Sequence, residues 1–454
     1  MDEFDERYFG GISEADPAAV GPPPGTAVAP ERPFALRGCV ITPDERIDDG
    51  YVEVAGDRIT SVGDRPPASS IVVLDTDGVI LPGLIDLHGH PEFNVFAPWE
   101  PPRLFENRGQ WRASPEYRSV VREPWNRLTA EIDGVSLLPT LTRYAEARSL
   151  VGGVTAIQGA SAKYPDPDES LVRNVDRRIF GRHRARSAID FDREDDATRA
   201  LRREQIASGE VTAYYVHLAE GIDERSRREF DDIAGADLVT PATVLVHGTA
   251  LGEAELRAVR EAGASLVWSP QSNLRLYGRT TAAARALELG IPMALGADWQ
   301  PSGSPSLLAE LGVAQRQLAV QGRPTPPREL VAMVTSTAAR IAGLEDRIGR
   351  LRPGLAADIV VLERHHEDPW LNVVDASPAW VRLVVIGGDL AYGHGPWIEA
   401  LAGPADLETA QAWGRPVSLD TRYSVRRSAT PAPRLAEVRA ALLARDLRVG
   451  PIFA

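Results

Sequence analysis

Four of the eight histidines, together with one aspartate, stand where strand-like apolar runs end. His88 and His90 close the first such run, and side chains two positions apart on a strand point to the same face. His217 closes the run Tyr-Tyr-Val-His, His247 closes Val-Leu-Val-His, and Asp298 follows a further apolar run in the same way. Three histidines and a carboxylate that converge would offer nitrogen and oxygen ligands to a divalent ion such as zinc or ferrous iron. The sequence therefore predicts a metal site.

The other four histidines have surroundings that favour a solvated or structural position. His183 lies between two arginines, His365 and His366 lie in a charged stretch, and His394 lies in a glycine-rich turn. We expect none of them to bind the metal.

The middle of the chain, residues 79–349, supplies elements that would bring the strand ends together. Short apolar runs alternate with runs of helical periodicity, which indicates parallel strands with right-handed crossovers. Repeated around a circle, this pattern gives a (β/α)8 TIM barrel, in which the carboxyl ends of all strands meet at one mouth. An open doubly wound sheet is the competitor, but its G-x-G-x-x-G phosphate loop is absent. The clearest strands are 243–246, 265–268 and 291–295, and the clearest helices are 252–262 and 280–289.

The segments before and after this barrel have a pattern that predicts short strands separated by turn residues. Residues 33–78 and 350–400 could together form one small β-sandwich domain, built from the two ends of the chain. Residues 1–32 are rich in proline and glycine and predict a flexible lead-in. Residues 401–454 predict a C-terminal extension with a helix over 433–447. The expected fold is α/β, a distorted barrel with a small β-sandwich beside it.

Composition narrows the class of protein further. The chain has 454 residues, 43% of them hydrophobic and 25% charged, which is typical of a globular protein. A net charge of −14 argues against a nucleic-acid partner, and the single cysteine excludes an internal disulfide. No apolar run is long enough to span a membrane, and the acidic start does not resemble a signal peptide. We expect a cytoplasmic protein whose partner is a small, planar molecule. Assembly into a homo-oligomer is compatible with the sequence.

Longer motifs surround the candidate ligands. They are Leu-Pro-Gly-Leu-Ile-Asp-Leu-His-Gly-His at 81–90, Gly-Val-Thr at 153–155, His-Leu-Ala-Glu at 217–220, Ser-Pro-Gln-Ser-Asn at 269–273, Gly-Ala-Asp-Trp at 296–299 and the segment 348–361. With these motifs the chain resembles the amidohydrolase superfamily, and within it the branch of cytosine and guanine deaminases and triazine hydrolases. The resemblance spans about residues 35 to 390. It implies a metal-dependent hydrolase whose barrel is flanked by a small β-sandwich.

The resemblance also implies roles for particular residues. His88, His90, His217 and Asp298 match the ligands of the one-metal members of the superfamily. His247 matches a histidine that contacts the metal-bound water or substrate, or that binds a second metal in two-metal relatives.

The same resemblance bears on the proton donor and on the number of metal ions. Glu220 matches the proton-shuttling glutamate of the deaminase branch. The two-metal relatives use a carboxylated lysine or a glutamate on a middle strand. Lys163, the only lysine, lies in a loop-like stretch, which favours one metal ion, zinc first and ferrous iron as the alternative.

These residues suggest a hydrolytic mechanism. Bound zinc lowers the pKa of water to about 7 and so provides hydroxide that can attack an sp² carbon. Asp298 would accept the water proton, Glu220 would protonate a ring nitrogen or the leaving group, and His247 would stabilise the developing charge. The alternative for Glu220 is a surface glutamate in an acidic loop.

An aromatic segment follows the first strand, with seven aromatic side chains between residues 91 and 127 and with Arg103, Arg108 and Arg112 interleaved among them. It could stack on a planar substrate over the barrel mouth, or form a subdomain core or a dimer contact. Its sequence departs from the cytosine and guanine deaminase patterns, which argues against a nucleobase substrate. The candidate substrate-binding residues are Trp99, Arg103, Trp111, Asn273 and Trp299.

Three functions compete at this point. The first is hydrolysis of a cyclic or aromatic C–N bond, either deamination of an amidine-like carbon or opening of a lactam or imide. The second is displacement of another group, such as halide, or cleavage of an acyclic amide. The third is a non-catalytic scaffold, which the complete set of candidate ligands disfavours.

Overall fold

The computed structural model describes residues 33–42, 45–159, 170–176, 179–180, 185–403, 407–419, 421, 433–450 and 452–453. The expected lead-in over 1–32 and the expectation for Lys163 lie outside these residues. Among the described residues, none of the helices combines the length and the apolar character that crossing a bilayer requires.

Eight parallel strands occupy the middle of the chain, in a five-stranded and a three-stranded sheet. Backbone bonds between residues that follow β5 and β12 join the two sheets, since Asp298 N donates to His88 O at 2.8 Å. The described residues include no ladder between β7 and β8. The strands are β5(Leu84–Asp86), β6(Val154–Ile157), β7(Arg173–Asn174), β8(Ala185–Ala188), β9(Ala213–Leu218), β10(Thr243–His247), β11(Ser265–Trp268) and β12(Met293–Leu295).

The apolar content of these strands explains their position. Every residue of β9, β10, β11 and β12 is buried, as expected for parallel strands covered on both faces. Alternate residues such as Ala213 and Tyr215 of β9 and Val244 and Val246 of β10 share one core cluster inside the ring of strands. In β9 the next residue of this series is His217, so the inner face leads directly from the apolar core to a candidate ligand.

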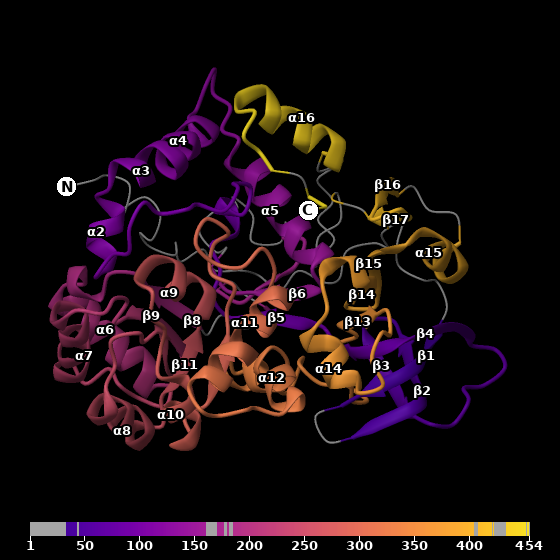
Figure 1. The fold of residues 1–454 in the computed structure, drawn as a ribbon. Helices are drawn as coiled ribbons and strands as arrows, with labels where there is room; N and C mark the ends of the chain where they lie inside the picture. The colour runs from indigo at the N-terminus through magenta and orange to yellow at the C-terminus, as the bar shows by residue number, and fades with distance from the viewer. Residues whose placement is uncertain are drawn as a thin grey trace.

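Helices surround these strands on the outside (Figure 1). Local signals bound two of them: Asp223 accepts a hydrogen bond from Ser226 N at the start of α7, and Gly263 ends α8 with φ of 72°. The predicted helices 252–262 and 280–289 correspond to α8 and α10. The bounds are α6(Asp196–Ala207), α7(Glu224–Gly235), α8(Glu253–Ala262), α9(Pro270–Tyr277), α10(Ala283–Glu288), α11(Leu307–Val320), α12(Pro327–Met333) and α13(Ser336–Ile341).

A nine-stranded sheet lies beside the barrel strands, and its strands come from both ends of the chain (Figure 1). The two ends meet where β13 pairs antiparallel with β4. Residues 33–78 and 350–400 both contribute strands to this one sheet, which also contains residues beyond 400. Its order is β16(Glu408–Ala412), β17(Arg415–Leu419), β15(Asp389–His394), β14(Val381–Ile386), β13(Ile359–Leu362), β4(Val72–Pro82), β1(Phe34–Ile41), β2(Arg46–Ala55) and β3(Arg58–Gly63).

The aromatic segment after β5 forms its own helical layer. It contains α2(Arg108–Arg112), α3(Pro115–Tyr117) and α4(Glu123–Thr129), followed by α5(Leu138–Val151). The C-terminal helix α16(Leu435–Arg445) packs across α4 and α5, as Figure 1 shows along the upper edge. The remaining helices are α14(Pro369–Val374), which contacts α11 and α12, and α15(Gly395–Ala402), which covers β15 and β17.

Candidate metal centre and active site

Four imidazole rings converge where the barrel strands end. The ring of His88 lies 5.0 Å from that of His90, 4.6 Å from that of His217 and 4.9 Å from that of His247, measured between centroids. Asp298 joins them, with its Oδ1 at 3.2 Å from His88 Nε2 and 3.7 Å from His90 Nε2. The structure therefore brings together the four predicted metal ligands, His88, His90, His217 and Asp298, with His247 beside them.

Backbone geometry at two strand ends turns side chains into this cluster. His247 follows Val246, an inner-face residue, and would point away from the core if the strand stayed extended. Its φ of 67° changes the direction of the chain, and Asp298 has a similar φ of 60°. Non-glycine residues in this left-handed region are strained, and such positions cluster at functional sites.

Close packing between β5 and β12 holds His88 and Asp298 together. A Cβ added at Gly296 would lie only 2.4 Å from His88 Cβ, so a glycine is required there. Asp86 braces the same junction by accepting hydrogen bonds from His88 N at 3.1 Å and Ala297 N at 3.2 Å. Burial raises the pKa of Asp86 to about 7.

The residues present fit a divalent metal ion. His88 is fully buried, and neither of its ring nitrogens has a hydrogen-bond partner among the described residues. Burial of an imidazole without hydrogen bonds is costly, and a coordinated cation would relieve that cost. Two groups of donor atoms lie mutually within 4.8 Å: His88 with His90 and His217, and His88 with His247 and Asp298.

The electrostatics of the cluster agree with this fit. Burial, reinforced by the neighbouring imidazoles, lowers the pKa of His217 well below its usual value, which favours the neutral ring that binds metals. Burial disfavours the charged form of Asp298, but the adjacent imidazoles outweigh it and lower the pKa of that carboxyl. An anionic oxygen and neutral nitrogens suit zinc or ferrous iron.

Asn273 fixes the orientation of His247. The Trp268 indole donates to Thr280 Oγ1 at 2.7 Å, which leaves the hydroxyl hydrogen free to donate to Asn273 Oδ1 at 3.2 Å. The amide nitrogen of Asn273 therefore donates to His247 Nδ1, 3.1 Å away. A neutral His247 ring in this arrangement carries its hydrogen on Nε2. Asn273, predicted to bind substrate, is fully buried and holds His247 instead of facing solvent.

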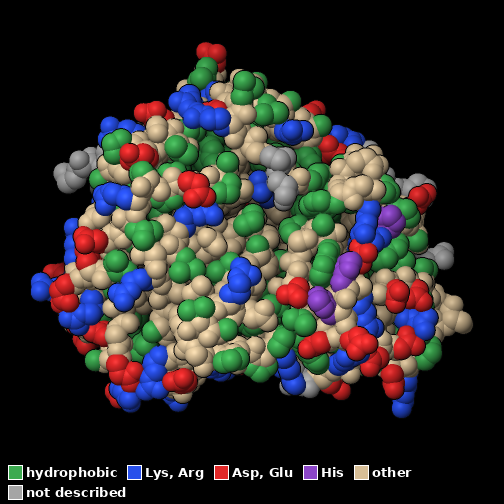
Figure 2. All heavy atoms as spheres, viewed as in Figure 1, with side chains coloured by type: hydrophobic (Ala, Val, Ile, Leu, Met, Phe, Trp, Pro, Cys, Tyr) green, Lys and Arg blue, Asp and Glu red, His purple; other side chains and the backbone are tan. Residues whose placement is uncertain are grey.

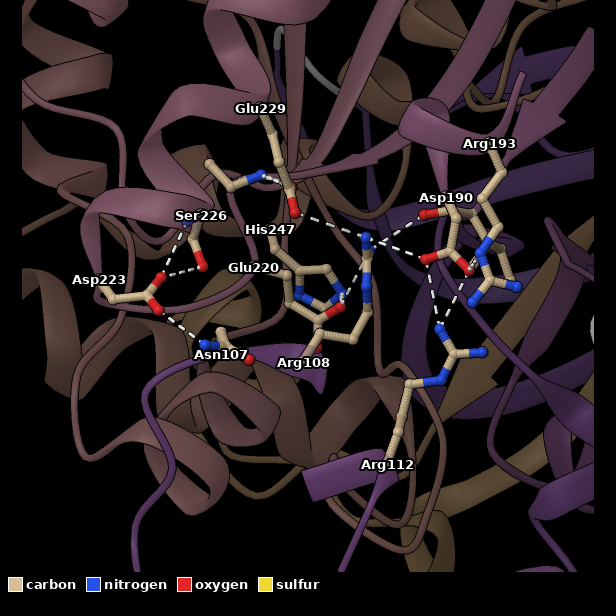
Figure 3. Close-up of polar contacts among 12 residues, drawn as sticks. Asn107, Arg108, Arg112, Asp190, Arg193, Glu220, Asp223, Ser226, Glu229 and His247 are labelled. Atoms are coloured by element: carbon tan, nitrogen blue, oxygen red, sulfur yellow. Dashed lines mark hydrogen bonds and ion pairs between the residues drawn. The ribbon is translucent and has the colours of Figure 1, made fainter. Parts of the chain in front are cut away.

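Glu220 is buried beside this cluster, so the surface position considered for it does not apply. Its Oε2 lies 3.8 Å from His247 Nε2 and 3.6 Å from Arg108 Nη1. Figure 3 shows the Arg108 guanidinium among three carboxylates, those of Glu220, Asp190 and Glu229. Glu220 thus faces the histidines while a buried arginine of α2 pairs with it.

The aromatic candidates form a cluster next to the metal-ligand residues. Trp299 directly follows Asp298, and its ring lies 5.4 Å from Trp111 and 5.9 Å from Tyr117. Trp99 is buried against Phe105 and Tyr117. These rings form the core of the segment, while their contact with substrate stays a prediction.

Arg103 lies at the exposed edge of these rings. It is exposed, contacts Gln110 and sits 4.6 Å from the centroid of Phe105, all within the same segment.

The sequence analysis did not assign two residues near Glu220 to the site. Tyr277 donates a hydrogen bond to Glu220 Oε1 at 2.7 Å, and Arg108 had been noted only as one of three arginines. Tyr277 lies four residues after Asn273 in α9, so helical spacing from a candidate residue was the available signal.

The histidines that were set aside lie elsewhere. His365 stacks on Trp380 with centroids 4.0 Å apart, and His366 and His394 are only partly buried. In Figure 2 histidine side chains appear on the surface over the nine-stranded sheet, away from the barrel strands. His183 lies outside the described residues.

Parallel strands whose carboxyl ends carry a buried His/His/His/Asp cluster define a class of metal-dependent barrel enzymes. Comparison with known families agrees, because residues 188–391 match the model of the amidohydrolase family. The chain carries an amidohydrolase-family domain. It is 26% identical, over 403 residues, to the 5-methylthioadenosine/S-adenosylhomocysteine deaminase 1 of Syntrophus aciditrophicus, an alignment that covers 78% of this chain and 90% of that protein.

Solved structures share the fold. An adenosine deaminase from Xanthomonas campestris with bound zinc superposes with a TM-score of 0.64 at 17% identity, covering 92% of this chain and 98% of that one. Atrazine chlorohydrolase from Arthrobacter aurescens TC1, complexed with zinc, gives 0.64 at 17% identity, covering 91% and 99%. Both similarities concern the fold, and both of those proteins were solved with zinc.

Proposed function

We propose that this chain is a metal-dependent hydrolase that attacks an sp² carbon of a small cyclic or aromatic molecule at a C–N bond. The observation that carries the proposal is the fully buried His88, whose ring nitrogens accept or donate no hydrogen bond of good geometry within the described part of the chain and which is surrounded by three imidazoles and Asp298. Deamination is the reaction we favour, because the deaminase from Syntrophus aciditrophicus aligns over most of both chains. The substrate class and the residue roles below are part of the proposal.

His88, His90, His217 and Asp298 would hold one divalent ion, and zinc is our first choice. The direction of the Asn273 hydrogen bond supports a single ion, because a hydrogen on His247 Nε2 leaves that nitrogen unable to bind a second one. When bound, the ion supplies Lewis acidity that makes water acidic enough to act as a nucleophile near neutral pH.

Side chains of the protein would accept and donate the protons of the reaction. Asp298 would accept one proton from the attacking water, because its lowered pKa keeps the buried carboxyl ionised, and would release it to the leaving group. Glu220 would take the other proton of that water and deliver it to the ring or leaving nitrogen, so that it is ionised again after each turnover. His247 donates from Nε2 to the negative charge that develops at the attacked carbon.

A substrate panel tests this proposal. Purified protein loaded with zinc is assayed for ammonia and chloride with 5-methylthioadenosine, S-adenosylhomocysteine, adenosine and atrazine. We expect ammonia from at least one ring amine, loss of this activity on chelation, and recovery on adding zinc back. Chloride release without ammonia would instead support displacement of halide, and release of neither from the zinc-loaded protein would contradict the proposal for this panel.

A further inference from the structure

We propose that Tyr277 is a positioning residue for Glu220 and that it directs proton transfer to one atom, Glu220 Oε2. This inference rests on the proposed function, because it assigns a partner to the proton-carrying carboxylate. It also gives the aromatic segment after β5 a role in the reaction, through Trp111 and Arg108 of α2.

The first argument is the direction of two hydrogen bonds. The Trp111 indole, which can only donate, lies 2.9 Å from Tyr277 Oη. The phenol has one hydrogen, and it points to Glu220 Oε1 at 2.7 Å. Oε1 is therefore held as an acceptor, and a proton carried by Glu220 must be carried on Oε2.

The second argument is what Oε2 faces. It lies 3.8 Å from His247 Nε2, on the side of the carboxylate where the imidazoles converge. Arg108 Nη1 approaches the same oxygen at 3.6 Å. Its guanidinium is also held by Asp190 at 3.0 Å and by Glu229 at 3.6 Å, contacts that Figure 3 draws as dashed lines. Oε1 is thus tied by Tyr277, and Oε2 is directed toward the cluster.

The third argument is burial. Glu220, Tyr277 and Trp111 all belong to the buried part of the protein. Burial, together with the adjacent Glu220 carboxylate, raises the pKa of Tyr277 well above its usual value, so the phenol keeps the hydrogen that it donates. Away from water, the loss of one such hydrogen bond leaves a charged oxygen without its partner, which is costly.

The backbone anchors α2 on both sides of Glu220. Arg108 N donates to Glu220 O at 3.3 Å, and Ile222 N donates to Glu106 O at 2.7 Å. The Asn107 side chain adds a hydrogen bond to Asp223 at 2.6 Å. The segment that carries Trp111 is therefore fixed to the strand end that carries Glu220, and Tyr277 closes the connection from α9.

Tyr277→Phe tests the inference, because it removes only the hydroxyl group. We expect kcat for ammonia release to fall about tenfold or more while KM changes less than about threefold, since a hydrogen bond to a charged group is lost without a change in shape. In the Glu220→Gln background the same substitution should have no further effect on kcat. Metal content should stay that of the wild type.

Tyr392→Phe is the matched control. Tyr392 is a fully buried tyrosine of β15 whose hydroxyl has no hydrogen-bond partner among the described residues. Its removal should leave kcat and KM unchanged. An equal fall in kcat for Tyr277→Phe with and without Glu220 would contradict the inference, because a residue acting through Glu220 cannot matter once the carboxylate is gone.

A second readout does not depend on activity. Crystal structures of zinc-loaded wild type and Tyr277→Phe should show an ordered Glu220 in the first and a rotated or disordered carboxylate in the second. An unchanged Glu220 in the variant would overturn the inference. Failure of the wild type to release ammonia, with the Glu220 difference present, would instead count against the proposed function alone.

Discussion

His88 is the residue on which the other side chains of the site converge. It lies within 5.0 Å of three imidazole rings, and its backbone oxygen accepts from Asp298 N. Its burial without hydrogen-bond partners is best explained as a ligand position. Glu220 lies beside this set, held at one oxygen by Tyr277, and can exchange protons at the other.

Glu220→Gln separates metal binding from proton transfer. The amide keeps the shape of the side chain but cannot carry the proton, so turnover should fall by about 10² or more, the usual size of general acid–base catalysis. Metal content measured on the same preparation should be unchanged. Turnover equal to that of the wild type would remove Glu220 from the mechanism.

At the scale of elements, α11 is tied to the site by Glu310. This fully buried carboxyl accepts from Gln271 N at the start of α9, at 3.0 Å, and pairs with Ser304 in the turn after Asp298. Burial, with a smaller contribution from Asp298, raises the pKa of Glu310 to about 8. A protonated Glu310 can donate to Ser304 while its other oxygen accepts from the backbone.

This raised pKa has a consequence for stability. Between about 4.5 and about 8 the folded chain holds a proton on Glu310 that the unfolded chain releases, so the free energy of unfolding falls as pH rises. The slope from one group is at most about 1.4 kcal/mol per pH unit. Glu310→Gln mimics the protonated form and should lose this dependence.

Denaturant unfolding of both proteins across this pH range measures the effect. The difference in unfolding free energy between the variant and the wild type should grow toward pH 8. A difference that stays constant with pH would contradict the role of Glu310.

The sequence predicts most of these helices and strands, but few of the side-chain contacts between them. Strands such as β10 and helices such as α8 can be predicted from the spacing of their apolar residues, because those residues are buried in the folded chain. The convergence of His217 and Asp298 follows from parallel strands that end at one mouth. Tyr277 and Arg108 were not assigned to Glu220, because contacts across 57 residues and 112 residues of chain depend on how α2 and α9 pack. The buried position of Asn273 also depends on packing, through Thr280 and Trp268.

At the scale of the whole molecule, a buried ion pair joins the barrel strands to the nine-stranded sheet. Arg173 of β7 donates two hydrogen bonds to Asp358, next to β13, at 2.7 and 2.8 Å. Asp358 also accepts from Gly387 N at 2.8 Å. The two parts of the protein therefore share one carboxylate that accepts two buried hydrogen bonds and one partly buried hydrogen bond.

Removal of that carboxylate should weaken the whole fold. Asp358→Ala leaves the Arg173 guanidinium without this partner in a buried position, and we expect a loss of about 3–5 kcal/mol of unfolding free energy. Glu253→Ala is the control, because Glu253 makes a similar two-point pair with Arg285 on the surface. The control should lose no more than about 1 kcal/mol. Equal losses of unfolding free energy in the two variants, measured by thermal or denaturant unfolding, would contradict a greater stabilisation by the buried pair than by the surface pair.

Elemental analysis of the metal content tests the central claim most directly. We predict about one divalent ion per chain in the wild type, zinc or iron, and loss of that ion in His88→Ala together with activity. A value close to two would contradict the single-ion site and make His247 a ligand of the second ion. A value near zero after reconstitution, or full occupancy in His88→Ala, would contradict the metal site itself.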